Sequence, residues 1–263
     1  MGLFDKKYCD VCGDKIGLFG NRKLEDGNLC RECAAKLSPW FSDRRSSTVD
    51  EIKEQLAYRE ANEAEVKRFN VTRTFGRTCT LCLDEDNEKF LVARTNDIRT
   101  ENPDVLNYSQ VTGCDLDIQE QRTEEMREIK DREGNTRRIS YNPPRYTYSY
   151  DFYIQIRVNA PYFDEIRFKL NKSEVEIYSM GSAQRGLAAA QNDDPRMQNP
   201  DYAEYYNMGQ EIREALTGIH AQVRENIAQA NAPKTAVTCP CCGAATIPGA
   251  AGICEYCGGA LNG

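Results

Sequence analysis

Eight cysteines near the two ends of the chain have the spacing of metal ligands. Each set reads C-x2-C, a spacer, and a second C-x2-C, which is typical of a tetrahedral structural zinc site. The two sets are Cys9, Cys12, Cys30 and Cys33, and Cys239, Cys242, Cys254 and Cys257. Because four thiolates fill every position around zinc, such a site leaves no room for substrate or catalytic water. The sequence therefore predicts two structural zinc ions per chain and no metal-based catalysis.

The overall composition favours a cytoplasmic protein. The chain has 263 residues, a net charge of −7 and 12 cysteines. Because the cytosol keeps thiols reduced, the paired spacing favours metal ligation over disulfides. No apolar run approaches the roughly 20 residues that span a bilayer, and the first residues lack the apolar core of a signal peptide. The acidic balance disfavours nucleic acid as a partner, since domains that bind it usually carry a basic patch.

Residues 1–41 are expected to form a treble-clef-like zinc module. A knuckle at Cys9–Gly13 precedes a hairpin that turns at Gly20-Asn21, and Cys30 opens a short helix that stops before Pro39. About 40 residues bury too little surface to fold alone, so zinc must supply much of the folding free energy.

Three aromatic residues of this module, Phe19, Trp40 and Phe41, are candidates for docking a partner. For Trp40, packing against the helix 30–37 to complete the small core is the favoured interpretation.

Residues 236–263 are expected to form a zinc ribbon from two knuckles, each with a glycine after its second cysteine. Cys241 lies inside the first knuckle as an odd thiol. It is interpreted as a spectator, because Cys242 has the two-residue spacing from Cys239, although exchange of Cys241 for Cys242 stays open.

The middle of the chain, residues 74–180, reads as an antiparallel β domain of about seven strands. Alternation is clearest in Arg145–Val158, where every even position is apolar or aromatic. An amphipathic helix follows at 200–231, with its stripe at Met208, Ile212, Leu216, Ile219, Val223 and Ile227. This order predicts a PH-like barrel closed by its C-terminal helix; a sandwich with a separate helical linker is the alternative. The fold class is thus α+β multidomain, with a zinc module at each end of the barrel.

Two helices raise further expectations. Residues 48–70 should form a connector helix that begins with a capping box of Thr48 and Glu51. Because nearly half of its residues are charged, it is expected to be solvated and to dock weakly. The helix 200–231 should pack on the β domain, and its spacing also suits pairing between chains in a homo-oligomer.

The N-terminal block resembles a family of small bacterial zinc-binding domains of unknown function. The resemblance rests on the CxxCG knuckle at Cys9–Gly13, KIGLFGxxKLxDG at Lys15–Gly27, and CxxCxxKLSPWF at Cys30–Phe41. It implies zinc at the first cysteine set, and a bacterial PH-like domain often follows in such proteins. The C-terminal CPxCG and CEYCG segments resemble generic zinc ribbons. Neither resemblance implies an activity.

The remaining reactive side chains are interpreted as structural. Cys79 and Cys82 form another C-x2-C outside the two sets, and Cys114 is a further thiol, but in a strand the pair points to opposite faces. A third metal site and a redox pair are the weaker alternatives. His220, the sole histidine, has no nucleophile pattern beside it.

The tyrosine-rich run Tyr141–Tyr153 could stack nucleic-acid bases, but its alternation favours core packing. The hairpin Arg127–Arg138 carries a net charge of only +2, which is too small for a firm prediction of phospholipid recognition.

These observations favour a non-enzymatic, cytoplasmic zinc-binding adaptor that mediates protein–protein interactions. The alternatives are a nucleic-acid- or ribosome-associated accessory factor and a PH-like membrane-surface binder.

Overall fold

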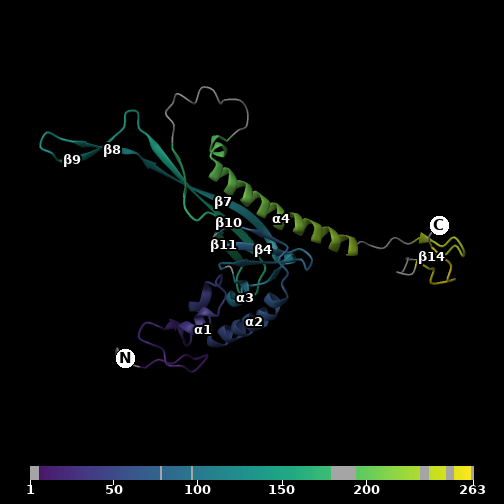
Figure 1. Ribbon diagram of the computed structural model, residues 1–263. Coiled ribbons are helices and arrows are strands. Elements are labelled where there is room, and N and C mark those ends of the chain that lie inside the picture. Colours follow the sequence, from purple (N-terminus) through teal and green to yellow (C-terminus); the bar gives the residue numbers. More distant parts are fainter. Residues whose placement is uncertain are drawn as a thin grey trace. The chain divides into compact units, whose positions relative to one another are not determined.

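The computed structural model describes residues 6–77, 79–95, 97–178, 194–231, 237–246 and 252–261. Figure 1 shows its elements. From residue 219 to 231 only the backbone is described. The chain divides into two compact units, residues 1–220 and 221–263, and the boundary falls inside helix α4 (Pro200–Asn231). In the part of the chain that the structure describes, every helix is too short or too polar to cross a lipid bilayer.

The first zinc module contains a two-stranded sheet and a short helix. Strand β1 (Arg22–Lys23) pairs antiparallel with β2 (Asn28–Leu29), and α1 (Arg31–Ala35) follows. The buried cluster of the module comprises Cys9, Ile16, Leu24, Leu29, Cys30, Cys33, Leu37 and Ile52. Ile52 comes from the next helix, so the core of this module extends past the expected boundary at residue 41.

Helix α2 (Val49–Arg68) begins after the 3₁₀ turn η1 (Asp43–Ser46), and its predicted capping box of Thr48 and Glu51 is confirmed. The expectation that the helix docks weakly is wrong. One face is buried along its whole length, at Ile52, Gln55, Arg59, Asn62 and Val66. Three of these five side chains are polar, so the number of apolar residues on α2 does not indicate how much of the helix is buried.

Two four-stranded antiparallel sheets enclose the main core. The first has the order β3-β4-β5-β6, and in the second β10 pairs with β7, β11 and β12. Along the chain, helix α3 (Ile98–Glu101) follows β5 and precedes β6. The strands are β3 (Arg73–Phe75), β4 (Thr80–Asp84), β5 (Lys89–Ala93), β6 (Leu106–Asn107), β7 (Val111–Glu124), β10 (Tyr146–Val158), β11 (Glu165–Lys169) and β12 (Val175–Tyr178). The predicted alternation in β10 is confirmed, because its even positions from Tyr150 to Val158 are buried.

The expected closed barrel does not form among the described residues, where the two sheets remain separate. They nevertheless share one core, to which the first sheet contributes Phe90 and the second contributes Phe152. Helix α4 packs on this core as predicted. The ring of Tyr202 on α4 lies 5.0 Å from that of Phe152, and Ile212 and Leu216 are fully buried.

A long hairpin extends beyond the sheets. Strands β8 (Met126–Lys130) and β9 (Thr136–Ser140) pair only with each other among the described strands, and they project from the far end of β7 (Figure 1). The predicted hairpin at Arg127–Arg138 is confirmed, and Gly134 in its turn has a φ of 84°.

The second zinc module contains one short antiparallel pair, β13 (Val237–Thr238) with β14 (Ala245–Thr246), and a bridge between Ile253 and Ala260.

Candidate metal centres

The four sulphur atoms of each cysteine set lie close enough together to bind one metal ion. Within each set all four Sγ atoms are within 4.8 Å of one another. The Cys12–Cys30 separation is 3.7 Å, and the Cys239–Cys257 and Cys242–Cys254 separations are 3.6 Å and 3.8 Å. Four sulphurs at about 2.3 Å from a tetrahedral zinc ion stand about 3.8 Å apart. The eight cysteines therefore fit two structural zinc ions, one in each cluster.

Three of the four C-x2-C segments are knuckles closed by the same backbone hydrogen bond. In the first, the Gly13 N–H donates to the Cys9 carbonyl at 2.8 Å, and Gly13 has a φ of 78°. Gly243 and Gly258 repeat this arrangement in the second module, with φ values of 71° and 70°. Because a Cβ atom is strained at such angles, glycine after the second cysteine lets the chain turn around the metal.

The fourth segment uses the start of a helix instead. Cys30 is the N-cap of α1, and its Sγ accepts a hydrogen bond from the Cys33 N–H at 3.3 Å. The first cluster therefore combines a knuckle with a helix start, whereas the second combines two knuckles.

Backbone N–H groups lower the pKa of one thiol in each cluster, which favours the thiolate form that binds a cation. Burial raises the pKa of Cys9, but N–H groups of Cys12 and Cys30 outweigh it and lower the pKa to about 7. The Cys242 N–H is the main cause that lowers the pKa of Cys239 to about 6.

The neighbouring thiols respond in the opposite direction. The Asp14 N–H lowers the pKa of Cys12, but burial and Cys9 together raise it to about 11. Four gathered thiols therefore do not all ionise by themselves, and a divalent cation supplies the charge that lets them do so.

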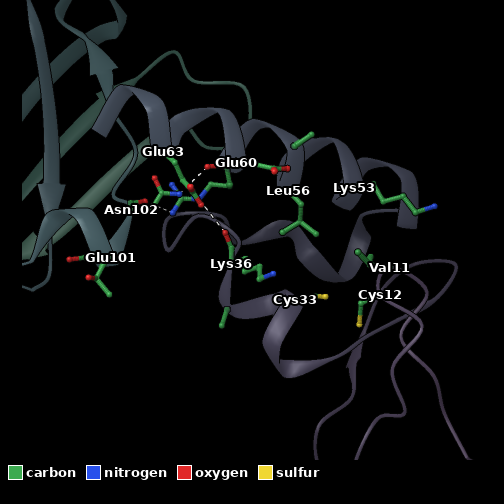
Figure 2. Close-up of a pocket in the computed structure, with 14 residues that line it drawn as sticks. Val11, Cys12, Cys33, Lys36, Lys53, Leu56, Glu60, Glu63, Glu101 and Asn102 are labelled. Carbon is green, nitrogen blue, oxygen red and sulfur yellow. Dashed lines mark hydrogen bonds between the residues drawn. The ribbon is translucent and has the colours of Figure 1, made fainter. Parts of the chain in front are cut away.

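A groove of about 620 Å³ lies beside the first cluster, between the zinc module and α2 (Figure 2). Figure 2 shows Leu56 pointing from α2 toward the module. The groove is lined by Val11, Cys12, Cys33, Ala35, Lys36, Lys53, Leu56, Ala57, Arg59, Glu60, Glu63, Thr100, Glu101 and Asn102. Cys12 and Cys33 therefore connect the metal centre directly to this groove, whose rim carries both signs of charge.

A buried ion pair holds the module against the rest of its unit. Arg59 on α2 contacts Asp104 at 2.6 Å, and their side chains are 6% and 0% exposed. Ser38 of the zinc module donates to the same carboxylate at 2.7 Å, and Arg59 donates to the Lys36 carbonyl at 3.2 Å and to the Asn102 carbonyl. Burial raises the pKa of the Asp104 carboxyl, and Arg59 and Ser38 offset only part of this effect. This network could not be predicted from local patterns, because a charged helix face gives no signal that one of its arginines is buried.

The other cysteines do not assemble a third centre among the described residues, where only the two four-cysteine sets gather. Cys79 and Cys114 belong to the main core, while Cys82 packs on the other side of β4 with Leu91 and Ala93. Burial raises the pKa of Cys82 to about 11 and that of Cys114 to about 12, which keeps these thiols protonated. Cys241 is exposed and lies outside the second cluster, which uses Cys242. The side chain of His220 lies outside the described residues.

The three candidate docking aromatics have different environments. Phe19 is 87% exposed, and the adjacent Leu18 is 81% exposed. Phe41 packs within the zinc module. The preferred interpretation of Trp40 was wrong, because its ring packs against the main core of the β sheets and not against the small core of the module.

Comparison with known families supports a domain at the N-terminus. A family described as "Domain of unknown function (DUF4428)" matches residues 7–55. The match continues past residue 41 into α2, in agreement with the position of Ile52 in the core of the module. No curated protein and no solved structure matched the chain.

Proposed function

We propose that this protein is a non-enzymatic adaptor whose first zinc module docks a protein partner. The observation that carries the proposal is the exposed pair Leu18 and Phe19. They lie in a turn closed by a hydrogen bond from the Gly20 N–H to the Gly17 carbonyl at 3.0 Å. Large apolar side chains exposed side by side on an ordered turn are a common feature of protein-binding surfaces. Zinc in the adjoining cluster keeps the loop in one conformation, which lowers the entropy lost on binding.

Closed four-thiolate centres support the non-enzymatic part of the proposal. Neither centre has an open coordination position for substrate, and the pKa values of the buried thiols Cys82 and Cys114 are raised, which disfavours a nucleophilic role. Twelve free cysteines fit a reducing, cytoplasmic location.

Two finer assignments of fold are part of the same proposal. A knuckle combined with a helix start supports a treble-clef-like first module, and two knuckles support a zinc ribbon. Two antiparallel sheets that share one core with a C-terminal helix support an open relative of the PH-like arrangement. Such domains usually serve in binding, which agrees with an adaptor.

The test is a pull-down from the native host with point variants. We expect Leu18→Ser/Phe19→Ser to lose a protein that the native chain captures, and purified partner to bind the variant at least tenfold more weakly. The matched control is Ile253→Ser/Tyr256→Ser in the second module, where the side chains are 49% and 73% exposed. Point variants are preferable to deletion of residues 1–41, which would uncover Ile52.

Both variants should keep two zinc ions in native mass spectrometry. Equal capture of the same proteins by all three chains would contradict the proposal. Binding to RNA or DNA that falls steeply with added salt, without a protein partner, would favour the accessory-factor alternative.

A further inference from the structure

The second metal centre has a fifth thiol beside it. Cys241 lies between the ligands Cys239 and Cys242 in the knuckle, and its side chain is exposed. The first centre has no comparable neighbour, because the three other cysteines outside the ligand sets pack among the β strands of unit 1. Of the twelve cysteines, Cys241 is therefore the one that adjoins a metal centre without being one of its four ligands.

Gly259 provides the space in which this fifth sulphur lies. A Cβ atom at Gly259 would be 2.8 Å from the Sγ of Cys241, 3.2 Å from its Cβ and 3.4 Å from the Sγ of Cys257. Because both sulphurs border the same point, they are no more than about 6 Å apart, which is the sum of 2.8 Å and 3.4 Å. Cys241 and Cys257 are thus neighbours across a space that a larger residue than glycine would fill.

Cys257 is a better disulfide partner for Cys241 than the adjacent Cys242. A disulfide joins sulphurs about 2.05 Å apart on residues whose Cα atoms are about 4.4–6.8 Å apart. A change of rotamer moves a cysteine sulphur by up to about 3 Å, so changes at both exposed side chains close the distance between Cys241 and Cys257. Adjacent residues have Cα atoms only about 3.8 Å apart, so a bond between Cys241 and Cys242 would be strained.

We propose that Cys241 and Cys257 form an oxidation site for a hydroperoxide, and that the resulting disulfide releases zinc from the second centre. Thiolate is the form of cysteine that binds metals and reacts as a nucleophile, and Cys257 is an exposed ligand. Its sulphur attacks the peroxide, so that an S–O bond forms and the O–O bond breaks. Hydroxide, or an alkoxide from an organic hydroperoxide, leaves and takes a proton from water. Cys257 is then a sulfenic acid.

Cys241 completes the reaction as the second thiol. Its sulphur attacks the sulfenic sulphur of Cys257, an S–S bond forms, and the S–O bond breaks with loss of a water molecule that carries the thiol proton. The two sulphurs together lose two electrons, which the two peroxide oxygens gain. The other ligands of the centre are less suited to this second step, because their sulphurs are bound to the metal whereas that of Cys241 is free to rotate.

Formation of the disulfide removes one of the four ligands from the metal. Among the described residues of the second module only Cys239, Thr246 and Cys254 are buried, so no apolar core keeps the remaining ligands in place. Oxidation should therefore release the ion and unfold this module. The first centre has an apolar core and no fifth thiol, so it should keep its ion longer. The inference concerns the second module alone and does not depend on the docking turn of the first.

The experiment is treatment of the full zinc-loaded chain with hydrogen peroxide, with zinc release followed by a colorimetric chelator. We expect one zinc ion per chain to leave about fivefold faster than the other, or more. Mass mapping of alkylated peptides should show a disulfide between Cys241 and Cys257. Addition of dithiothreitol and zinc should restore two bound ions in native mass spectrometry.

Two variants test the role of the fifth thiol. Cys241→Ser removes it, whereas Gly259→Ala keeps it but places a methyl group against its sulphur. Each should slow release of the faster ion about fivefold and leave two zinc ions on the untreated chain. The matched control, Cys79→Ser, removes a thiol from the β sheets and should leave the rate of release unchanged.

Several outcomes would overturn the proposal. They are an unchanged rate of release in either variant, equal rates for the two ions of the native chain, and a disulfide confined to the four ligands. Oxidation of Cys241 to a sulfinic acid with both zinc ions retained would also overturn it, because the thiol would then react without reaching the metal centre.

Discussion

The two zinc modules have the same ligands but differ in the support that surrounds them. The first cluster is embedded in an apolar core that includes Ile16, Leu24, Leu29 and Ile52. In the described residues of the second module, 237–246 and 252–261, the buried side chains are only Cys239, Thr246 and Cys254. Metal and core together therefore stabilise the first module, whereas the metal is the main source of stability for the second.

This difference shows that cysteine spacing identifies a metal centre but not how strongly a module depends on it. Ile52 of α2 is part of the core of the first module. The module is also joined to the rest of unit 1 through the buried pair of Arg59 and Asp104. A small zinc module therefore becomes part of a larger domain when a neighbouring helix completes its core.

Loss of zinc should reveal the difference between the two modules most clearly. Cys12→Ser and Cys257→Ser should each reduce the zinc count from two to one in native mass spectrometry. Structural zinc contributes about 10–16 kcal/mol in small peptides, so Cys257→Ser should abolish amide protection in residues 237–246 and 252–261 while the melting of unit 1 stays unchanged. Cys12→Ser should lower the melting temperature of unit 1 but leave its β sheets folded.

Hydrogen exchange and calorimetry would check these outcomes. Persistent protection of the second module without zinc would contradict the difference argued above. A third zinc ion that depends on Cys79 and Cys82 would contradict the assignment of these cysteines to the core.

Breaking the buried ion pair should have the next largest effect. Asp104→Ala leaves the Arg59 guanidinium buried without its partner, and such a loss costs about 3–5 kcal/mol. On the same helix, Lys53→Ala removes a pair with Asp50 whose side chains are 50% and 88% exposed, so it should cost less than about 1 kcal/mol. Urea denaturation of unit 1 measures both.

The double variant Arg59→Met/Asp104→Leu sharpens this test. Because apolar replacement of both partners removes the unpaired charge, stability should recover in large part. Absence of recovery would show that the hydrogen bonds of Arg59 to Lys36 and Asn102 matter more than the charge pair.

Local patterns predicted local structure well in this chain. The knuckle glycines, the capping box at Thr48 and the alternation of β10 each reflect a rule that operates within a few residues. The errors concern contacts between distant segments. Charged residues on α2 suggested a solvated helix, but Arg59 is buried because Asp104, 45 residues away, provides its partner. The position of Trp40 on the main core likewise depended on an arrangement that spacing does not encode.

Truncation of the helix residue that completes the first core should have an intermediate effect. Ile52 is fully buried, and Ile52→Ala should cost about 3 kcal/mol through lost burial and the resulting cavity. Its counterpart in the second module, Ile253→Ala, removes a side chain that is 49% exposed and should stay within about 0.5 kcal/mol. Zinc affinity, measured by competition with a chelator, should fall for Ile52→Ala and not for Ile253→Ala. Equal effects would show that α2 does not support the first cluster.

The smallest expected effect tests whether the knuckles themselves are equivalent. Gly13 and Gly243 have φ values of 78° and 71°, and a Cβ atom at either would meet no heavy atom within 4 Å. Alanine at either position therefore costs only backbone strain, about 1 kcal/mol, or roughly a fivefold loss of zinc affinity at its own cluster. Gly218→Ala, within helix α4 and also without a close neighbour, should instead stabilise the chain by about 0.5–1 kcal/mol. A much larger loss of zinc affinity at Gly243 than at Gly13 would mean that the knuckle of the second module cannot relax around the added methyl group. Because this knuckle lacks an apolar core beneath it, the difference between the modules would then extend to the metal-binding loops.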